Sequence, residues 1–252
     1  MCVYLYVRSL IIKFPIHFLL IFLSFLYYIN NSNFIFYIYI PFTIPIHTFH
    51  FQIWDFGGNE IFYTTHQFFL TPRALYTLIF RVDDPAFMSN IEYWMQMIRL
   101  CAGAPPPPIL IIGTHVDNVT VSEVDAVRTM LVNRYGEPNR NRGYYFLNCL
   151  NSAHITDLKS LLLSFAAHPS LRTKVSGSQL YLVERLASLQ KNQQRTIEVP
   201  EFRKMGEECG VPPASYNATL HLFHQLGVLF YFRDTNDSGL VVLDPMWLVD
   251  IM

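Results

Sequence analysis

From residue 51 to about residue 170, short apolar runs alternate with longer segments in which apolar residues recur at every third or fourth position. The short runs predict buried strands, and the periodic segments predict amphipathic helices. Apolar strands separated by helices are typical of a parallel sheet covered on both faces, which is an α/β fold. The predicted strands cover residues 51–54, 74–82, 109–113 and 144–147, and the predicted helices cover residues 88–101, 121–135 and 155–165.

After Pro169 the pattern changes to three helical segments followed by two short strands. This winged-helix-like order predicts a second, α+β part of the chain. A winged helix could suggest DNA binding, but residues 178–252 contain six basic and nine acidic residues, so we expect no nucleic-acid partner. The predicted helices cover residues 178–190, 199–209 and 216–226, with another from residue 245, and the predicted strands cover residues 228–232 and 240–243.

Residues 1–50 have an unusual composition. Ile, Phe, Leu and Tyr supply 30 of these 50 positions, and the only charged residues are Arg8 and Lys13. Residues 10–29 form an apolar run that could be a transmembrane helix, which needs about 20 residues. The alternative is that residues 1–50 are not native family sequence, for example because of a mispredicted exon. Both interpretations stay open.

The positions of the charges argue against a working membrane anchor. Arg8 and Lys13 lie at the start of the chain, so the positive-inside rule would leave the N-terminus in the cytosol and carry residues 51–252 across the membrane. The four cysteines are scattered and form no CxxC pair, which is typical of reduced intracellular thiols rather than of a zinc site. We therefore expect a cytoplasmic protein, membrane-associated only if residues 10–29 are a genuine anchor.

Polar residues follow the predicted strands, and ligands of a parallel sheet bind at the carboxyl ends of its strands. Asp55 precedes Gly57 and Gly58, and an aspartate there can hold Mg²⁺ through water while a glycine N–H approaches a phosphate. Asp117 follows the strand 109–113, and its carboxylate can accept two hydrogen bonds from the N1–H and N2–H₂ of guanine, a donor pair that adenine lacks. The other strand-end residues are Asp83 with Asp84, Thr114 with His115, and Asn148 with Cys149.

Several segments together resemble the Roco family, in which a Ras-like GTPase domain called Roc is followed by a COR domain. Residues 54–76 (WDFGGNEIFYTTHQFFLTPRALY) are similar to the Roc switch II region, and residues 113–117 (GTHVD) are similar to the guanine motif of the family. Residues 226–229 (LGVL) and 242–248 (VLDPMWL) resemble COR. The resemblance implies three parts: the apolar segment 1–50, a partial Roc domain over 51–170, and the N-terminal part of COR over 171–252.

The resemblance also implies roles for individual residues. Asp55 would be linked to Mg²⁺, Gly57 and Gly58 would lie at the γ-phosphate, and Asn59 would take the place of the glutamine that orients the attacking water. Thr114, His115 and Asp117 would form the guanine motif, with Asp117 reading the base and His115 covering it. Asn148 and Cys149 would form the last guanine-binding loop.

Two departures from the family pattern change the expected function. No P-loop motif (GxxxxGK followed by Ser or Thr) occurs, and the first glycine of the chain is Gly57. Asn59 is one methylene shorter than glutamine, so hydrolysis would be slow. We expect a nucleotide switch that binds GTP or GDP with Mg²⁺ in the complete protein, with this chain impaired in GTP binding, and a homodimer formed through Roc and COR. The alternative is a non-catalytic pseudo-GTPase scaffold, which residues 10–29 could tether to a membrane.

Overall fold

The structure is a computed structural model, and it describes residues 2–8, 36–44, 47–56, 69–104, 106–233, 239–244 and 247. The chain divides into two compact units, Met1–Arg172 and Thr173–Met252. The predicted helix 10–29 lies outside the described residues. Within the part of the chain that is described, no helix combines the length and the apolar character needed to cross a membrane.

The first unit is built on a six-stranded sheet. Its strands are β1 (Cys2–Arg8), β2 (Phe36–Ile44), β3 (His47–Phe56), β4 (Leu75–Arg81), β5 (Ile109–Thr114) and β6 (Arg142–Phe146). Their order across the sheet is β2-β3-β1-β4-β5-β6. Strands β4, β5 and β6 are parallel, while β1 is antiparallel to both of its neighbours, β3 and β4. Strand β3 therefore runs in the same direction as β4, and the predicted parallel α/β sheet is confirmed.

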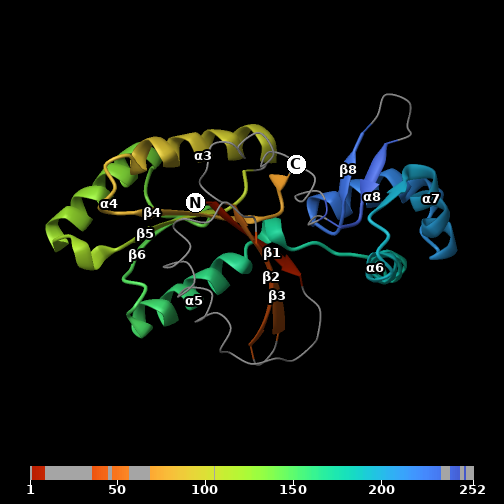
Figure 1. Cartoon of the computed structure of the whole chain (residues 1–252), viewed down its shortest axis with the longest axis horizontal. Helices are drawn as coiled ribbons and strands as arrows, with labels where there is room; N and C mark the ends of the chain where they lie inside the picture. Colours follow the sequence, from red (N-terminus) through yellow and green to blue (C-terminus); the bar gives the residue numbers. More distant parts are fainter. Residues whose placement is uncertain are drawn as a thin grey trace. The chain divides into compact units, whose positions relative to one another are not determined.

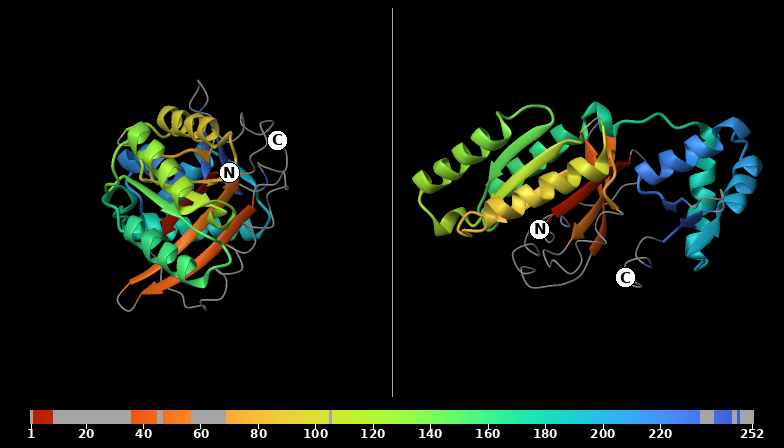
Figure 2. Two further views of the ribbon diagram at one scale, coloured as in Figure 1. Left: turned by 90° about the vertical axis from the view of Figure 1, so that its left-hand side faces the viewer. Right: turned by 90° about the horizontal axis from the view of Figure 1, so that it is seen from above.

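Three long helices cover this sheet: α3 (Phe87–Ala102), α4 (Val121–Tyr135) and α5 (Ser152–Ala166). Helices α3 and α5 lie on opposite faces, as Figures 1 and 2 show. All six residues of β5 are buried, which explains why its first four residues are all apolar. One face of the sheet packs against α5 through a cluster that contains Leu75, Leu110, Ile112, Ile155, Leu158 and Phe165.

The starts of α4 and α5 are set by capping side chains in the local sequence. Helix α4 begins with a capping box, in which the Thr120 side chain accepts from the Glu123 N–H and the Glu123 carboxylate accepts from the Thr120 N–H. Asn151 caps α5 by accepting from the Ala153 N–H at 2.9 Å. These caps fix the starts of the two helices that follow β5 and β6, and so define the length of the loops at that edge of the sheet.

The described residues of the second unit form three long helices and a small antiparallel sheet of order β7-β9-β8. Its elements are α6 (Gly177–Lys191), β7 (Thr196–Glu198), α7 (Val199–Glu208), α8 (Tyr216–Gln225), β8 (Phe230–Phe232) and β9 (Leu240–Val242). The three helices and the hairpin were predicted, but β7 was missed because three residues are too few to show a periodicity. The helix predicted from residue 245 falls almost entirely on residues that the structure does not describe.

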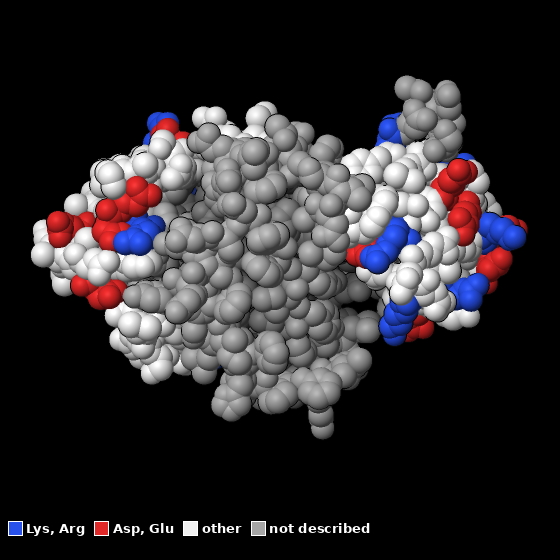
Figure 3. Space-filling view, viewed as in Figure 1, with Lys and Arg blue, Asp and Glu red and all other residues white. Residues whose placement is uncertain are grey.

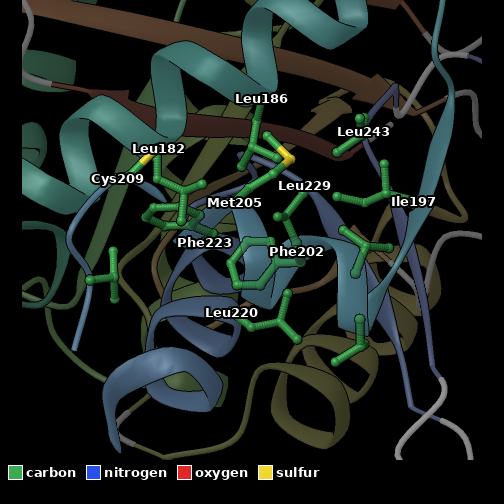
Figure 4. Close-up of a cluster of buried hydrophobic side chains, with 13 residues drawn as sticks. Leu182, Leu186, Ile197, Phe202, Met205, Cys209, Leu220, Phe223, Leu229 and Leu243 are labelled. Atoms are coloured by element: carbon green, nitrogen blue, oxygen red, sulfur yellow. The ribbon is translucent and has the colours of Figure 1, made fainter. Parts of the chain in front are cut away.

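Apolar side chains from all three helices meet in the core of the second unit (Figure 4). Phe202 of α7 and Phe223 of α8 pack edge to face, with ring centroids 6.3 Å apart. Arg195 and Asp244 form an ion pair that joins the residue before β7 to the end of the hairpin. Among the described residues visible in Figure 3, both acidic and basic side chains appear on each unit.

Candidate functional site

The predicted site residues come from the carboxyl ends of different strands. Asp55 is the last residue but one of β3, and Thr114 is the last residue of β5. Because β3 and β5 run in the same direction, Asp55 and the loop after Thr114 come at the same edge of the sheet. Only the backbone of Asp55 is described, and Gly57, Gly58 and Asn59 lie outside the described residues.

The loop after β5 is a tight turn held by hydrogen bonds. Val116–Asn118 forms one turn of 3₁₀-helix, and the Asn118 N–H donates to the His115 carbonyl at 3.1 Å. The buried Thr114 hydroxyl donates to the Phe80 carbonyl of β4 at 3.0 Å. The first residue of the motif therefore fastens the turn to the neighbouring strand.

His115 has a left-handed backbone conformation, with φ of 60°. Such a conformation costs a non-glycine residue about 1–3 kcal/mol and persists only where the surroundings impose it. His115 Nδ1 lies 2.9 Å from Thr114 Oγ1. Since the single hydroxyl hydrogen of Thr114 is already donated to Phe80, the geometry assigns a proton to Nδ1, which donates to the hydroxyl. The orientation of the imidazole is thus fixed by the preceding residue.

Asp117 lies on the turn itself. Its side chain is exposed, and among the described residues its carboxylate makes no hydrogen bond or ion pair. The next residue, Asn118, donates from Nδ2 to Asp83 Oδ2 at 2.9 Å, across to the loop after β4. The carboxylate that the sequence assigns to base recognition is therefore available to a ligand while the turn that carries it is anchored.

The loop after β6 contributes Asn148 and Cys149. The Asn148 side-chain oxygen accepts from the Leu150 N–H at 2.8 Å, and the Asn148 N–H donates to His154 Nδ1 at 3.0 Å. Burial raises the pKa of the half-buried Cys149 thiol, and the nearby charge of Asp117 raises it further. The structure therefore brings the loops after β5 and β6 together, while the Asn148 side chain is used within its own turn.

The sequence did not predict that two further residues, Asp83 and His154, position these loops. Asp83 was noted only as a strand-end carboxylate, and nothing linked it to Asn118, which is 35 residues away. His154 lies on α5 and gives no motif signal. Contacts of this kind depend on the register of β4 and β5, in which Arg81 is level with Thr114, and not on spacing within one segment.

The other end of the site lacks a phosphate cradle among the described residues. In a P-loop protein the cradle follows a strand of the sheet. Here β1 occupies the central position but is reversed, so that Cys2 is level with Phe56 of β3 and Leu78 of β4, whereas Arg8 is level with His50. Strand β1 therefore ends, at Arg8, toward the edge of the sheet opposite to Asp117. The described residues also contain no group of three or more His, Cys, Asp or Glu side chains placed to hold a metal ion.

The chain is similar to several known proteins. Residues 40–117 match the family model described as Roc, the Ras of Complex domain of DAPkinase. In Dictyostelium discoideum, the probable serine/threonine-protein kinase qkgA is 26% identical over 263 residues, covering 80% of this chain and 17% of that protein. The probable kinase roco11 of the same organism is 36% identical over 150 residues, covering 58% of this chain and 10% of that protein.

The chain belongs to the Roco family. A solved structure of Methanosarcina barkeri Roco2 RocCORdC bound to GDP superimposes with a TM-score of 0.68 at 24% identity, covering 88% of this chain and 65% of that chain. This likeness shows the fold that the Roco chain shares with that protein. The Roco chain spans less than a fifth of the length of the two Dictyostelium relatives.

Proposed function

We propose that this Roco chain is a guanine-nucleotide-binding signalling protein that binds the guanine base selectively and binds the phosphates weakly. The observation that carries the proposal is the exposed carboxylate of Asp117, which makes no hydrogen bond or ion pair with the described residues and lies on an anchored turn at the carboxyl edge of the sheet. A carboxylate accepts hydrogen bonds only, so it pairs with the two donors on the guanine edge and repels the acceptor N1 of adenine. The GDP bound to the Methanosarcina Roco2 structure supports a nucleotide ligand for the same fold.

The neighbouring residues complete the proposed base site. His115 would cover one face of the base, with its imidazole oriented by Thr114 at 2.9 Å. Cys149, near Asp117, and Asn148 would close the other side through the loop after β6. These groups bind and orient the base, and none of them performs chemistry on it.

The phosphate end is proposed to be incomplete. Asp55 with Mg²⁺, the amides of Gly57 and Gly58, and Asn59 as the residue that orients water are assigned by resemblance alone. Mg²⁺, when bound, neutralises charge on the terminal phosphates. This proposal is supported by the reversed strand β1 and by the absence of any glycine before Gly57, because the described residues then offer no cradle for the β- and γ-phosphates. Binding of GTP would therefore be weak and its hydrolysis slow.

A second candidate function is a non-catalytic scaffold, and the reversed orientation of β1 favours it. In this case the Roc part (51–170) and the COR part (171–252) would act through surfaces, with dimerisation through Roc and COR as the expected assembly. A scaffold needs no discrimination between bases. The two candidates therefore differ in a property that can be measured.

Calorimetric titration of the full chain with GDP and with ADP, each with Mg²⁺, tests the proposal. The base site predicts binding of GDP and no measurable binding of ADP at the same concentrations. The variant Asp117→Asn should weaken GDP binding about 10- to 100-fold, because a hydrogen bond to a charged group contributes about 1.5–3 kcal/mol. Asp125→Asn, on the exposed surface of α4, is the matched control. Equal affinities for GDP and ADP would favour the scaffold.

A further inference from the structure

The guanine-motif turn is attached at one end to the neighbouring strand β4 and at the other end to the loop after β4. At its start, the Thr114 hydroxyl donates to the Phe80 carbonyl at 3.0 Å. At its end, Asn118 Nδ2 donates to Asp83 Oδ2 at 2.9 Å. His115 and Asp117, which the proposed function assigns to the base, lie between these two attachments. The position of Asp117 therefore depends on a residue of the loop after β4.

The turn needs such an attachment because it is strained. His115 is left-handed at φ 60°, and the 3₁₀ turn that follows is closed by the single backbone bond from Asn118 to His115. A strained segment of this kind relaxes when its surroundings no longer impose it. Asn118 is the residue directly after Asp117, so release of the Asn118 side chain frees the half of the turn that carries the carboxylate.

Asp83 is itself held in place. Arg81 Nε donates to Oδ1 at 2.9 Å, and Arg81 Nη2 donates to Oδ2 at 2.8 Å, so the guanidinium grips both carboxylate oxygens. The hydrogen bonds from Arg81 and then Asn118 keep the pKa of the Asp83 carboxyl far below its usual range. Its negative charge is present throughout the pH range in which proteins are normally handled, and its Oδ2 is a fixed acceptor for Asn118.

We infer that Asp83 is a positioning residue for guanine recognition: through Asn118 it holds the turn so that the Asp117 carboxylate faces the edge of the base. This inference rests on the proposed function of the site. Asp83 does not contact the nucleotide in this scheme. Its removal should therefore reduce the selectivity for the guanine edge and not only the amount of active protein.

Base selectivity separates positioning from a general loss of structure. Inosine diphosphate keeps the N1–H and O6 of GDP but lacks the 2-amino group that donates to Asp117. In the unaltered chain GDP should bind roughly tenfold or more tightly than inosine diphosphate. In Asp83→Ala this ratio should fall toward one. In Asp83→Asn it should be partly restored, because the amide oxygen can still accept from Asn118.

Asp84→Asn is the matched control. This substitution removes one negative charge from the residue next to Asp83. Asp84 Oδ1 accepts from the Ala86 N–H at 2.9 Å, and the side-chain oxygen of asparagine can still accept this hydrogen bond. The ratio of its affinities for GDP and inosine diphosphate should equal that of the unaltered chain. Partial unfolding would weaken GDP and inosine diphosphate equally, and so would leave the ratio unchanged.

Amide hydrogen exchange gives a readout that needs no nucleotide. The Asn118 N–H is protected by its bond to the His115 carbonyl, and Asp83→Ala should speed its exchange about two- to tenfold without changing that of buried β5. Unchanged exchange and an unchanged GDP to inosine diphosphate ratio would overturn the inference. Failure of the unaltered chain to bind any guanine nucleotide would instead overturn the proposed function, and with it the role of Asp83 in recognition.

Discussion

The Asp117 carboxylate lies near enough to the Cys149 thiol for its charge to raise the pKa of that thiol, beyond the larger effect of burial, although the two residues come from different loops. The two loops follow β5 and β6, which are neighbouring parallel strands. Their proximity is therefore a direct consequence of strand direction. It also gives the proposed base site a chemical probe that requires no added label.

The rate at which Cys149 is alkylated should change when Asp117 is substituted and when a nucleotide binds. Asp117→Asn removes a neighbouring negative charge, so the pKa of the thiol falls, more thiolate is present at pH 8, and iodoacetamide reacts faster. Saturating GDP should slow the reaction of the unaltered chain by covering the loop. Peptide mapping by mass spectrometry measures both effects.

Cys101 of α3 is the internal control for this labelling. It is also half-buried, and burial alone raises the pKa of its thiol. Neither Asp117→Asn nor GDP should change its rate. An equal effect of GDP on Cys101 and Cys149 would place the nucleotide elsewhere or indicate a general change in stability.

Gly113 should be intolerant of a side chain because of how closely β5 and β6 approach. A Cβ at this position would lie 2.6 Å from Cδ1 of Phe146 and 2.9 Å from Cγ2 of Val82. Gly113→Ala should therefore reduce the free energy of unfolding by about 1–3 kcal/mol, the usual cost of overpacking. Urea denaturation measures the loss.

Gly177→Ala is the matched control, since a Cβ at the first residue of α6 meets nothing within 4 Å. It should leave the free energy of unfolding unchanged or slightly higher, because alanine favours helix formation. Equal destabilisation by both substitutions would contradict the close contact between Gly113 and Phe146.

The second unit should lose stability in mild acid through His224. The His224 Nδ1 accepts from the Tyr231 N–H at 3.2 Å, so it must be unprotonated in the folded chain. Burial lowers the pKa of His224, and the charge of His221 lowers it further. The unfolded chain then binds a proton more readily than the folded chain, and stability falls as the pH decreases from about 6.5 through the lower folded pKa.

Thermal unfolding of the second unit, followed by circular dichroism between pH 7 and pH 5, measures this dependence. His224→Asn keeps a side-chain acceptor and cannot titrate in this range, so its unfolding temperature should vary less with pH than that of the unaltered chain. An unchanged pH dependence in the variant would show that another group is responsible.

Much of the fold could be predicted from the sequence because the decisive patterns are local. The apolar run at β5 and the periodicity of α3 are each contained within one element, and the polar residues that follow β5 gave the position of Thr114 and Asp117 at a strand end. The attachment of Asn118 to Asp83 could not be predicted, because it depends on which strands are neighbours and on their register.

The orientation of β1 illustrates a second limit. An apolar alternation reads the same in both directions, so the composition of residues 1–50 could not indicate that Cys2–Arg8 joins the sheet or that it runs against β3 and β4. The sequence suggested only that the phosphate motif is missing. The direction of β1 adds a physical reason, since this strand ends toward the edge of the sheet away from Asp117.

The most direct measurement of the central claim compares the affinities of the full chain for guanosine and for GDP with Mg²⁺, by calorimetry at one salt concentration. If the base is recognised and the phosphates have no cradle, the two dissociation constants should agree to within about tenfold, which is about 1.4 kcal/mol. Binding of GDP more than a thousandfold tighter than guanosine would show a working phosphate site and contradict the account.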